Sequence, residues 1–117
     1  MIEFTLPIKT VSESNGSHGN WWAKANRRLA QRKEVWAAMR GKSPPELPVT
    51  VTLTRISAGM LDAHDNLRGS LKTVVDEIAD QYKLPDNDPQ FDWRYAQEKA
   101  KRGVYGVRIR IETRKEP

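Results

Sequence analysis

Residues 49–54 alternate valine or leucine with threonine, and this alternation limits the possible folds more than any other feature of the sequence. Successive side chains of a strand point to opposite faces of a sheet, so the apolar residues face a core and the threonines face away from it. Apolar residues then recur at helical spacing over 67–82, and Asp65 or Asn66 is placed to cap that helix. A strand followed by an amphipathic helix predicts a helix packed on one face of a sheet.

Alternating apolar and polar residues predict further strands near the two ends of the chain. Residues 2–8 show the pattern, and so do residues 104–112. A shorter strand is expected over 93–97, just before the last one. Residues 99–103 would then join the two as a hairpin loop.

Helical spacing also predicts a first helix from residue 22 to about residue 40, where Gly41 is placed to end it. Five residues share one side of this helix and are expected to face the core: Trp22, Ala25, Leu29, Trp36 and Met39. Lysine and arginine residues occupy the other side, which is expected to face solvent.

The predicted order is strand, helix, strand, helix, strand, strand. This order predicts an α+β fold in which a mixed β-sheet of about four strands carries two main helices. A chain of 117 residues has the size of one domain, so we expect residues 1–117 to share a single core, with residues 113–117 as a frayed tail.

Charge is distributed unevenly along the chain, whose net charge is +5. Residues 1–55 hold nine basic and four acidic side chains, residues 56–92 hold three and eight, and residues 93–117 hold eight and three. The basic ends favour a polyanionic partner such as a nucleic acid. Carboxylates at the centre of the chain suit a protein that places cations against the phosphates of such a partner. The alternative explanation of the acidic segment is a helix whose charged face is exposed to solvent.

The composition excludes several classes of protein. The chain has no cysteine, which excludes disulfide frameworks, thiolate metal sites and cysteine nucleophiles, and its two histidines cannot form a three-histidine zinc site. No apolar run approaches the roughly 18–20 residues of a membrane span, and the first residues lack the features of a signal peptide. We therefore expect a cytoplasmic protein with no membrane partner.

One stripe of the second predicted helix, opposite its apolar side, carries the carboxylates of Asp65 and Asp76, the amine of Lys72, and Gly69, which leaves room beside them. Asp62 lies just before this helix, and Asp88 lies beyond its end. The two ends of the helix are some 25 Å apart. The carboxylates of Asp62, Asp65 and Asp88 therefore meet only if the turn over 84–91 folds back along the helix.

Carboxylates grouped in this way suit a hard divalent cation such as Mg²⁺, which takes oxygen ligands and leaves positions for substrate phosphate and water. Such an ion polarises a phosphodiester, and a lysine beside it stabilises the charge that builds on phosphorus. The alternative is purely structural. Asp65 would then cap the helix, while Lys72 and Asp76 form an exposed ion pair and residues 86–88 form a turn.

The same stretch resembles the core of the RusA family, which are small Mg²⁺-dependent Holliday junction resolvases encoded by phages and prophages. In that family a strand ends in an Asp-x-Asp-Asn-Leu motif, a helix bearing a lysine follows, and a further aspartate precedes a strand. Residues 65–67 match the end of the motif, and residues 87–91 match the late stretch, with Asp88 as its aspartate. Lys72 is the candidate for the family lysine. The resemblance covers roughly residues 49–112.

Two positions depart from the family pattern. Ala63 stands where the first motif aspartate is expected, and Asp62 lies one residue earlier, so Asp62 can substitute only if the chain bulges by one residue. His64 is an alternative donor, although Mg²⁺ prefers oxygen. Lys72 lies three residues later than the family lysine, whose place Gly69 takes.

The resemblance implies a Mg²⁺-dependent endodeoxyribonuclease that cuts four-way DNA junctions in recombination and repair, with Mn²⁺ as an alternative metal. It implies that Asp62, Asp65 and Asp88 hold the metal and that Lys72 assists at the scissile phosphate. It also implies a homodimer that acts in the cytoplasm of a bacterial host. Six cations are our candidates for DNA phosphate contacts: Lys24, Arg27, Arg28, Arg32, Arg108 and Arg110.

Two other functions stay open. A RusA-like fold could bind branched DNA without cutting it, and the displaced first aspartate favours that reading. A basic domain that is not a nuclease could instead bind single strands while its acidic helix contacts a protein partner. Each of the six candidate cations has the alternative role of a solubilising surface charge.

Overall fold

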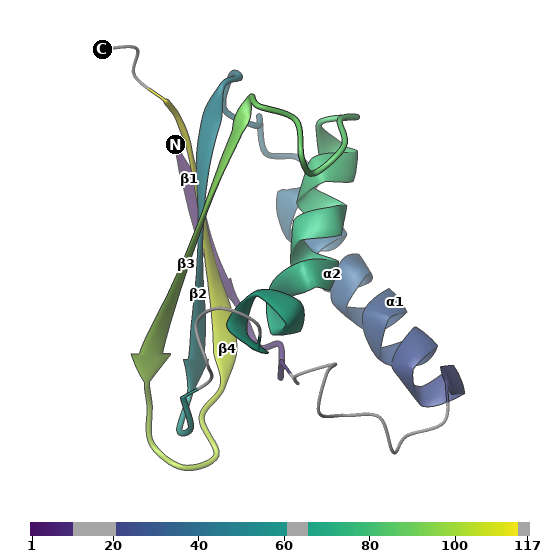
Figure 1. The fold of residues 1–117 in the computed structure, drawn as a ribbon, viewed down its shortest axis with the longest axis vertical. Coiled ribbons are helices and arrows are strands. Elements are labelled where there is room, and N and C mark those ends of the chain that lie inside the picture. The colour runs from purple at the N-terminus through teal and green to yellow at the C-terminus, as the bar shows by residue number, and fades with distance from the viewer. Residues whose placement is uncertain (11–20, 61–65, 115–117) are drawn as a thin grey trace.

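Four strands form one mixed sheet, and two helices cover one of its faces (Figure 1). The computed structural model describes residues 1–10, 21–60 and 66–114. Its elements follow the predicted order: β1 (Ile2–Leu6), α1 (Trp21–Met39), β2 (Val49–Ser57), α2 (Asn66–Gln81), β3 (Phe91–Lys99) and β4 (Gly106–Thr113). The predicted α+β fold is therefore confirmed, as a single domain around one core.

The strands lie in the order β1-β4-β2-β3. β4 runs antiparallel to both β1 and β2, whereas β3 runs parallel to β2, so that α2 is the crossover helix between two parallel strands. The expected hairpin between the last two strands is wrong, because β3 and β4 lie on opposite sides of β2. Figure 1 shows their connection passing around the end of β2.

The apolar content of the two strands explains this placement. Val107, Ile109 and Ile111 of β4 are completely buried, whereas Trp93 and Tyr95 of β3 are only partly buried. The more apolar strand occupies a central position, where both neighbouring strands cover it. The strand with the partly buried aromatic side chains lies at the edge, beside β2 alone.

The core lies between the sheet and α2. Every second residue of β2 points into it, and Val49, Val51 and Leu53 are completely buried. From α2 the core receives the apolar side that the sequence predicts, with Leu67, Leu71, Val74, Val75 and Ile78 all buried. The alternation and the helical spacing in this half of the chain thus predict correctly which side chains are covered.

The predicted core side of α1 is wrong. Trp22, Leu29 and Trp36 are 61%, 54% and 46% exposed, and Ala25 is exposed as well. Of the five predicted residues only Met39 is buried, and it shares its side of the helix with Val35 and the polar Gln31. The physical reason is that α1 packs mainly against α2 rather than flat on the sheet, so it buries a narrow strip. Gly41, with a φ of 79°, follows the end of this helix as predicted.

The sheet face that carries no helix is polar. Arg108 and Arg110 of β4 point to this face, as the alternation predicts, together with the threonines of β2. The expected frayed tail is wrong for its first two residues. The Thr113 hydroxyl donates to the Glu46 carbonyl at 2.8 Å, and the amide of Arg114 donates to the Pro48 carbonyl at 2.8 Å. Within the described ranges, no helix is long and apolar enough to cross a membrane.

Candidate functional site

The chain returns along α2 after that helix ends. Residues 82–90 form the connection to β3, and the Asp86 carboxylate in this connection forms an ion pair with the Lys72 ammonium group. The indole nitrogen of Trp93 donates to the Asp86 carbonyl at 2.7 Å and fixes the backbone there. Asp62, Asp65 and Asp88 meet only if the turn after α2 folds back along the helix. The ion pair of Lys72 with Asp86 shows that the chain does fold back along α2 as far as Asp86.

Lys72 is held between two carboxylates. Its ammonium group contacts Asp86 and also Asp76, one helical turn further along α2, at 3.0 Å. The hydrogen bond with Asp86 and, to a smaller extent, the one with Asp76 raise the pKa of Lys72. The bond from Lys72 in turn lowers the pKa of Asp86. At neutral pH this lysine therefore stays charged, which suits it to stabilise an anion rather than to accept a proton.

A second cation and an aromatic residue lie beside this pair. The Arg68 guanidinium stacks over the Tyr95 ring, 5.3 Å from its centroid. Burial raises the pKa of Tyr95, and the charges of Arg68 and Lys72 oppose that shift. Tyr95 points to the helix-covered side of the sheet, in register with Leu53. β3 thus lies beside the first turn of α2, the end of the helix that is nearest to Asp65 in the sequence.

A groove of about 390 Å³ runs between the two helices at this place. Arg28 lines it from α1, and Gly69, Lys72, Thr73 and Asp76 line it from α2. Three members of the predicted stripe therefore do share one surface, because they face α1 rather than the core. The groove brings a cation predicted to contact DNA next to the lysine predicted to assist catalysis.

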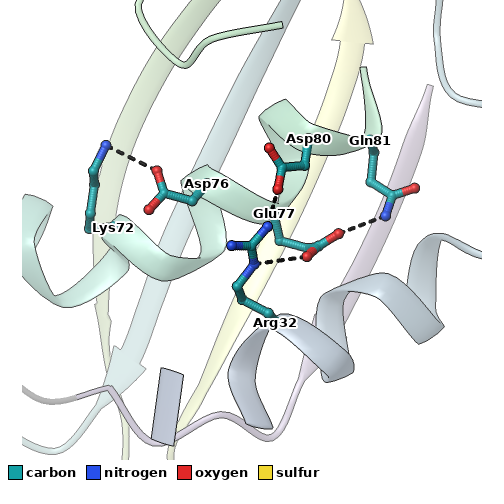
Figure 2. A network of polar contacts seen from close by, with 6 residues as sticks. All are labelled: Arg32, Lys72, Asp76, Glu77, Asp80 and Gln81. Atoms are coloured by element: carbon teal, nitrogen blue, oxygen red, sulfur yellow. Dashed lines mark hydrogen bonds and ion pairs between the residues drawn. The ribbon is translucent and has the colours of Figure 1, made fainter. Parts of the chain in front are cut away.

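Further along, ion pairs tie α1 to α2. The Arg32 Nε donates to Glu77 at 3.0 Å and its terminal nitrogen pairs with Asp80, while the Gln81 amide donates to Glu77 at 2.7 Å. Figure 2 shows Arg32 reaching across to α2 beside the pair of Lys72 and Asp76. Arg32, predicted to contact DNA, is thus engaged in an ion-pair network that holds the two helices together.

The predicted metal ligands are only partly visible. Asp62 and Asp65 lie outside the described residues, as does the alternative donor His64. Asp88 lies in the connection that returns along α2, where one of its oxygens accepts from the Gln90 amide at 2.9 Å. In the part of the chain that the structure describes, no three His, Cys, Asp or Glu side chains are grouped as metal ligands. The structural alternative also has support, because Lys72 and Asp76 do pair and Asp88 does stabilise a turn.

The six candidate DNA contacts do not form one surface. Four of them are on α1: Lys24, Arg27, Arg28 and Arg32. Arg108 and Arg110 lie on the opposite side of the sheet, where Arg108 pairs with Glu98 at 3.2 Å and Arg110 with Glu112 at 3.1 Å. The sheet separates the two sets, so one straight duplex cannot contact both on the same protomer.

Sequence reasoning missed three residues of this site. The sequence predicts Asp86 only as part of a turn and Tyr95 only as part of a strand, and it assigns no role to Arg68. The signal for Asp86 was its position two residues before Asp88 in the stretch that resembles the family. No local pattern points to Arg68 or Tyr95, because their contact depends on β3 lying beside β2.

A scan against protein-family models and a search of the curated proteins found no match to this chain. The resemblance to the RusA family therefore remains a prediction that rests on the motif residues.

Proposed function

We propose that the protein is a Mg²⁺-dependent endonuclease that cuts four-way DNA junctions by hydrolysis of a phosphodiester. One observation carries the proposal: the connection after α2 returns along the helix, so that Asp86 contacts Lys72. This return puts the late acidic stretch beside the helix that follows Asp62 and Asp65. Without it, the two halves of the proposed site would lie at opposite ends of α2.

The donor atoms suit the metal. Asp62, Asp65 and Asp88 would supply carboxylate oxygens, the ligands that Mg²⁺ prefers, and an ion bound there would polarise the phosphodiester. The Asp88 carboxylate accepts a hydrogen bond from the backbone amide of Gln90, and this bond stabilises the turn that carries Asp88. Ala63 offers no donor, so Asp62 has to replace the family's first aspartate.

The cations of the groove have separate roles in this proposal. Lys72 remains protonated and stabilises negative charge at the scissile phosphate. Asp76 and Asp86 hold its side chain in place until DNA binds, and a phosphate oxygen then competes with them for the ammonium group. Arg28, across the groove, contacts a flanking phosphate and positions the strand.

A homodimer completes the proposal. A two-fold axis suits a junction that is cut symmetrically on two strands, because each protomer then supplies one site. In a dimer, the cations of α1 and the pair of Arg108 and Arg110 could contact different arms of the junction, because its arms leave in several directions. We expect the enzyme to act in the cytoplasm of a bacterial host.

The test is cleavage of a labelled synthetic four-way junction beside a matched linear duplex, each with Mg²⁺, with Mn²⁺ and with EDTA. The wild type should make paired nicks in the junction alone and only with metal. Asp65→Asn should abolish cutting and leave junction affinity within about threefold, because Asp65 holds the metal and not the DNA. Glu46→Gln, on the loop before β2, is the matched control and should cut normally.

Two outcomes would replace the proposal. Tight junction binding without cutting under either metal would mean a binding-only protein, with Ala63 as the expected reason. Stronger binding to single strands than to junctions would favour a non-nuclease module. The exposed Trp22 and Trp36 give that second reading a physical basis, since unpaired bases stack on exposed aromatic rings.

A further inference from the structure

Arg55 is a buried cation near the end of β2. Arg55 is only 8% exposed, and its side chain points to the helix-covered side of the sheet, as does that of Leu53 two positions earlier. Its Nε donates to the Thr10 hydroxyl at 2.9 Å, and one terminal nitrogen donates to the Gly59 carbonyl at 2.7 Å. Both acceptors are neutral. Among the described residues no carboxylate forms an ion pair with Arg55, and burial lowers its pKa.

This arrangement is costly unless something compensates it. A buried charge normally has a counterion, because removal from water is unfavourable for the ion alone. An arginine stays protonated even then, since its guanidinium does not lose its proton in proteins. The guanidinium has five N–H donors, and the bonds to Thr10 and Gly59 use two of them. Among the described residues, Arg55 therefore presents a fixed positive charge whose two hydrogen bonds both go to neutral acceptors.

A pocket of about 220 Å³ opens beside this guanidinium. Besides Arg55, the described part of its lining includes a second cation, Lys9, and three residues with hydroxyl groups, Thr10, Ser57 and Tyr105; none of these described lining residues is a carboxylate. Pockets for drug-sized ligands measure about 300–1,000 Å³. This pocket is smaller, so it admits a group the size of a phosphate and not a whole nucleotide.

We propose that the pocket between Arg55 and Lys9 binds one phosphate group. The planar guanidinium fork matches two phosphate oxygens, and Lys9 adds a second charge at the rim. The oxygens of a tetrahedral phosphate can accept hydrogen bonds from both cations and from the hydroxyl groups of the lining at the same time. Its identification as a phosphate of the DNA backbone rests on the proposed function. The support for that source is that Gly59, bonded to Arg55, lies three residues before Asp62.

The first arm of the test uses inorganic phosphate alone. In ¹⁵N-labelled protein the Nε–Hε resonance of Arg55 and the amide resonances of Thr10 and Ser57 should shift and saturate as phosphate is added. Chloride at the same ionic strength should leave them unchanged. Lys9→Asn should weaken phosphate binding about fivefold. Lys83→Asn is the matched control, because it removes the same charge in the connection after α2, outside the described lining of this pocket, and a φ of 58° accommodates asparagine there.

Arg55→Lys gives a second variant of the phosphate arm, since it keeps the charge and loses the fork. It should weaken binding more than Lys9→Asn does, and circular dichroism checks that it folds. If it does not fold, Lys9→Asn decides. Equal shifts with chloride, or equal affinities of Lys9→Asn and Lys83→Asn, would overturn the phosphate site.

The second arm identifies the source of the phosphate. Junction affinity is measured in EDTA, where nothing is cut, as a function of salt. Lys9→Asn should reduce the slope of log affinity against log salt by about 0.9, the value for one lost phosphate contact, and Lys83→Asn should not. Phosphate binding with an unchanged slope would mean that the pocket takes free phosphate and not DNA. Absence of junction binding altogether would contradict the proposed function and leave the phosphate arm to decide the pocket.

Discussion

Both helices carry apolar residues at helical spacing, but the two are buried in different ways. α2 lies against the sheet and buries its whole apolar side, whereas α1 leaves three of its large apolar residues exposed and buries Gln31. The difference follows from what each helix packs against. A sheet covers a wide strip of a helix, whereas a second helix covers only a narrow one. Apolar spacing thus shows that a helix forms, but the neighbours determine which of its sides is buried.

Leucine truncation on each helix should show the largest difference. Leu71→Ala removes a completely buried side chain of α2, and we expect the free energy of unfolding to fall by about 2–5 kcal/mol. Leu29→Ala, the same change on α1 at a position that is 54% exposed, should cost less than about 1 kcal/mol. Urea unfolding of both variants measures the difference. Equal losses would mean that α1 packs on the sheet as the sequence predicted.

The ion pairs between the helices should have an intermediate effect. Arg32→Ala removes the cation that α1 supplies to Glu77, whose side chain is 11% exposed, and we expect a loss of about 1–2 kcal/mol. Arg40→Ala is the matched control, because Arg40 lies directly after α1 and its guanidinium stacks on the exposed Trp36 ring. Thermal unfolding measures both. An equally small effect of the two changes would mean that Arg32 contributes nothing to helix pairing.

The pair of Lys72 and Asp86 should have the smallest effect on stability, below about 1 kcal/mol, because the two side chains are 57% and 39% exposed. The folded pKa of Asp86 is lowered, so its contribution is present above the unfolded value of about 3.9 and is lost as the pH falls through the folded value. The pKa of Lys72 is raised, so the alkaline limit lies above about 10.4.

Urea unfolding of the wild type and Asp86→Asn between pH 2 and pH 7 measures this contribution. The stability difference should be constant near neutral pH, should begin to shrink as the pH falls below about 4, and should disappear once the pH is below the lowered folded pKa of Asp86. Asp92→Asn on the open face of the sheet serves as the matched control. A difference that persists unchanged at pH 2 would show that Asp86 acts through packing or turn geometry and not through its charge.

Local patterns predicted the elements well, because alternation and helical spacing are properties of neighbouring residues. β2, β4 and the buried side of α2 follow from them. The place of β3 does not, because the parallel pairing of β2 with β3 depends on a crossover that no local pattern encodes. The expected hairpin failed for this reason, and the exposed tryptophans of α1 were missed because helix packing is also non-local.

The candidate site likewise has one part that local sequence patterns predict and another that depends on how distant segments pack. The stripe of Gly69, Lys72 and Asp76 follows from helical geometry, and the structure places all three in one groove. The contact of Lys72 with Asp86, 14 residues away, required the turn to return along α2. The separation of Arg108 and Arg110 from the cations of α1 depends on which face of the sheet the helices cover. No pattern within a single strand determines that choice.

Junction cleavage by two lysine variants tests the central claim most directly. Lys72→Ala and Lys33→Ala each remove one exposed charge, from the proposed site on α2 and from the outer side of α1. With Mg²⁺ we predict that Lys72→Ala lowers the cleavage rate about 100- to 1,000-fold while junction affinity in EDTA changes less than threefold. Lys33→Ala should keep the wild-type rate. Equal rates for the two variants, with a junction that is cut, would contradict the account, because the groove beside Asp86 would then not be the active site.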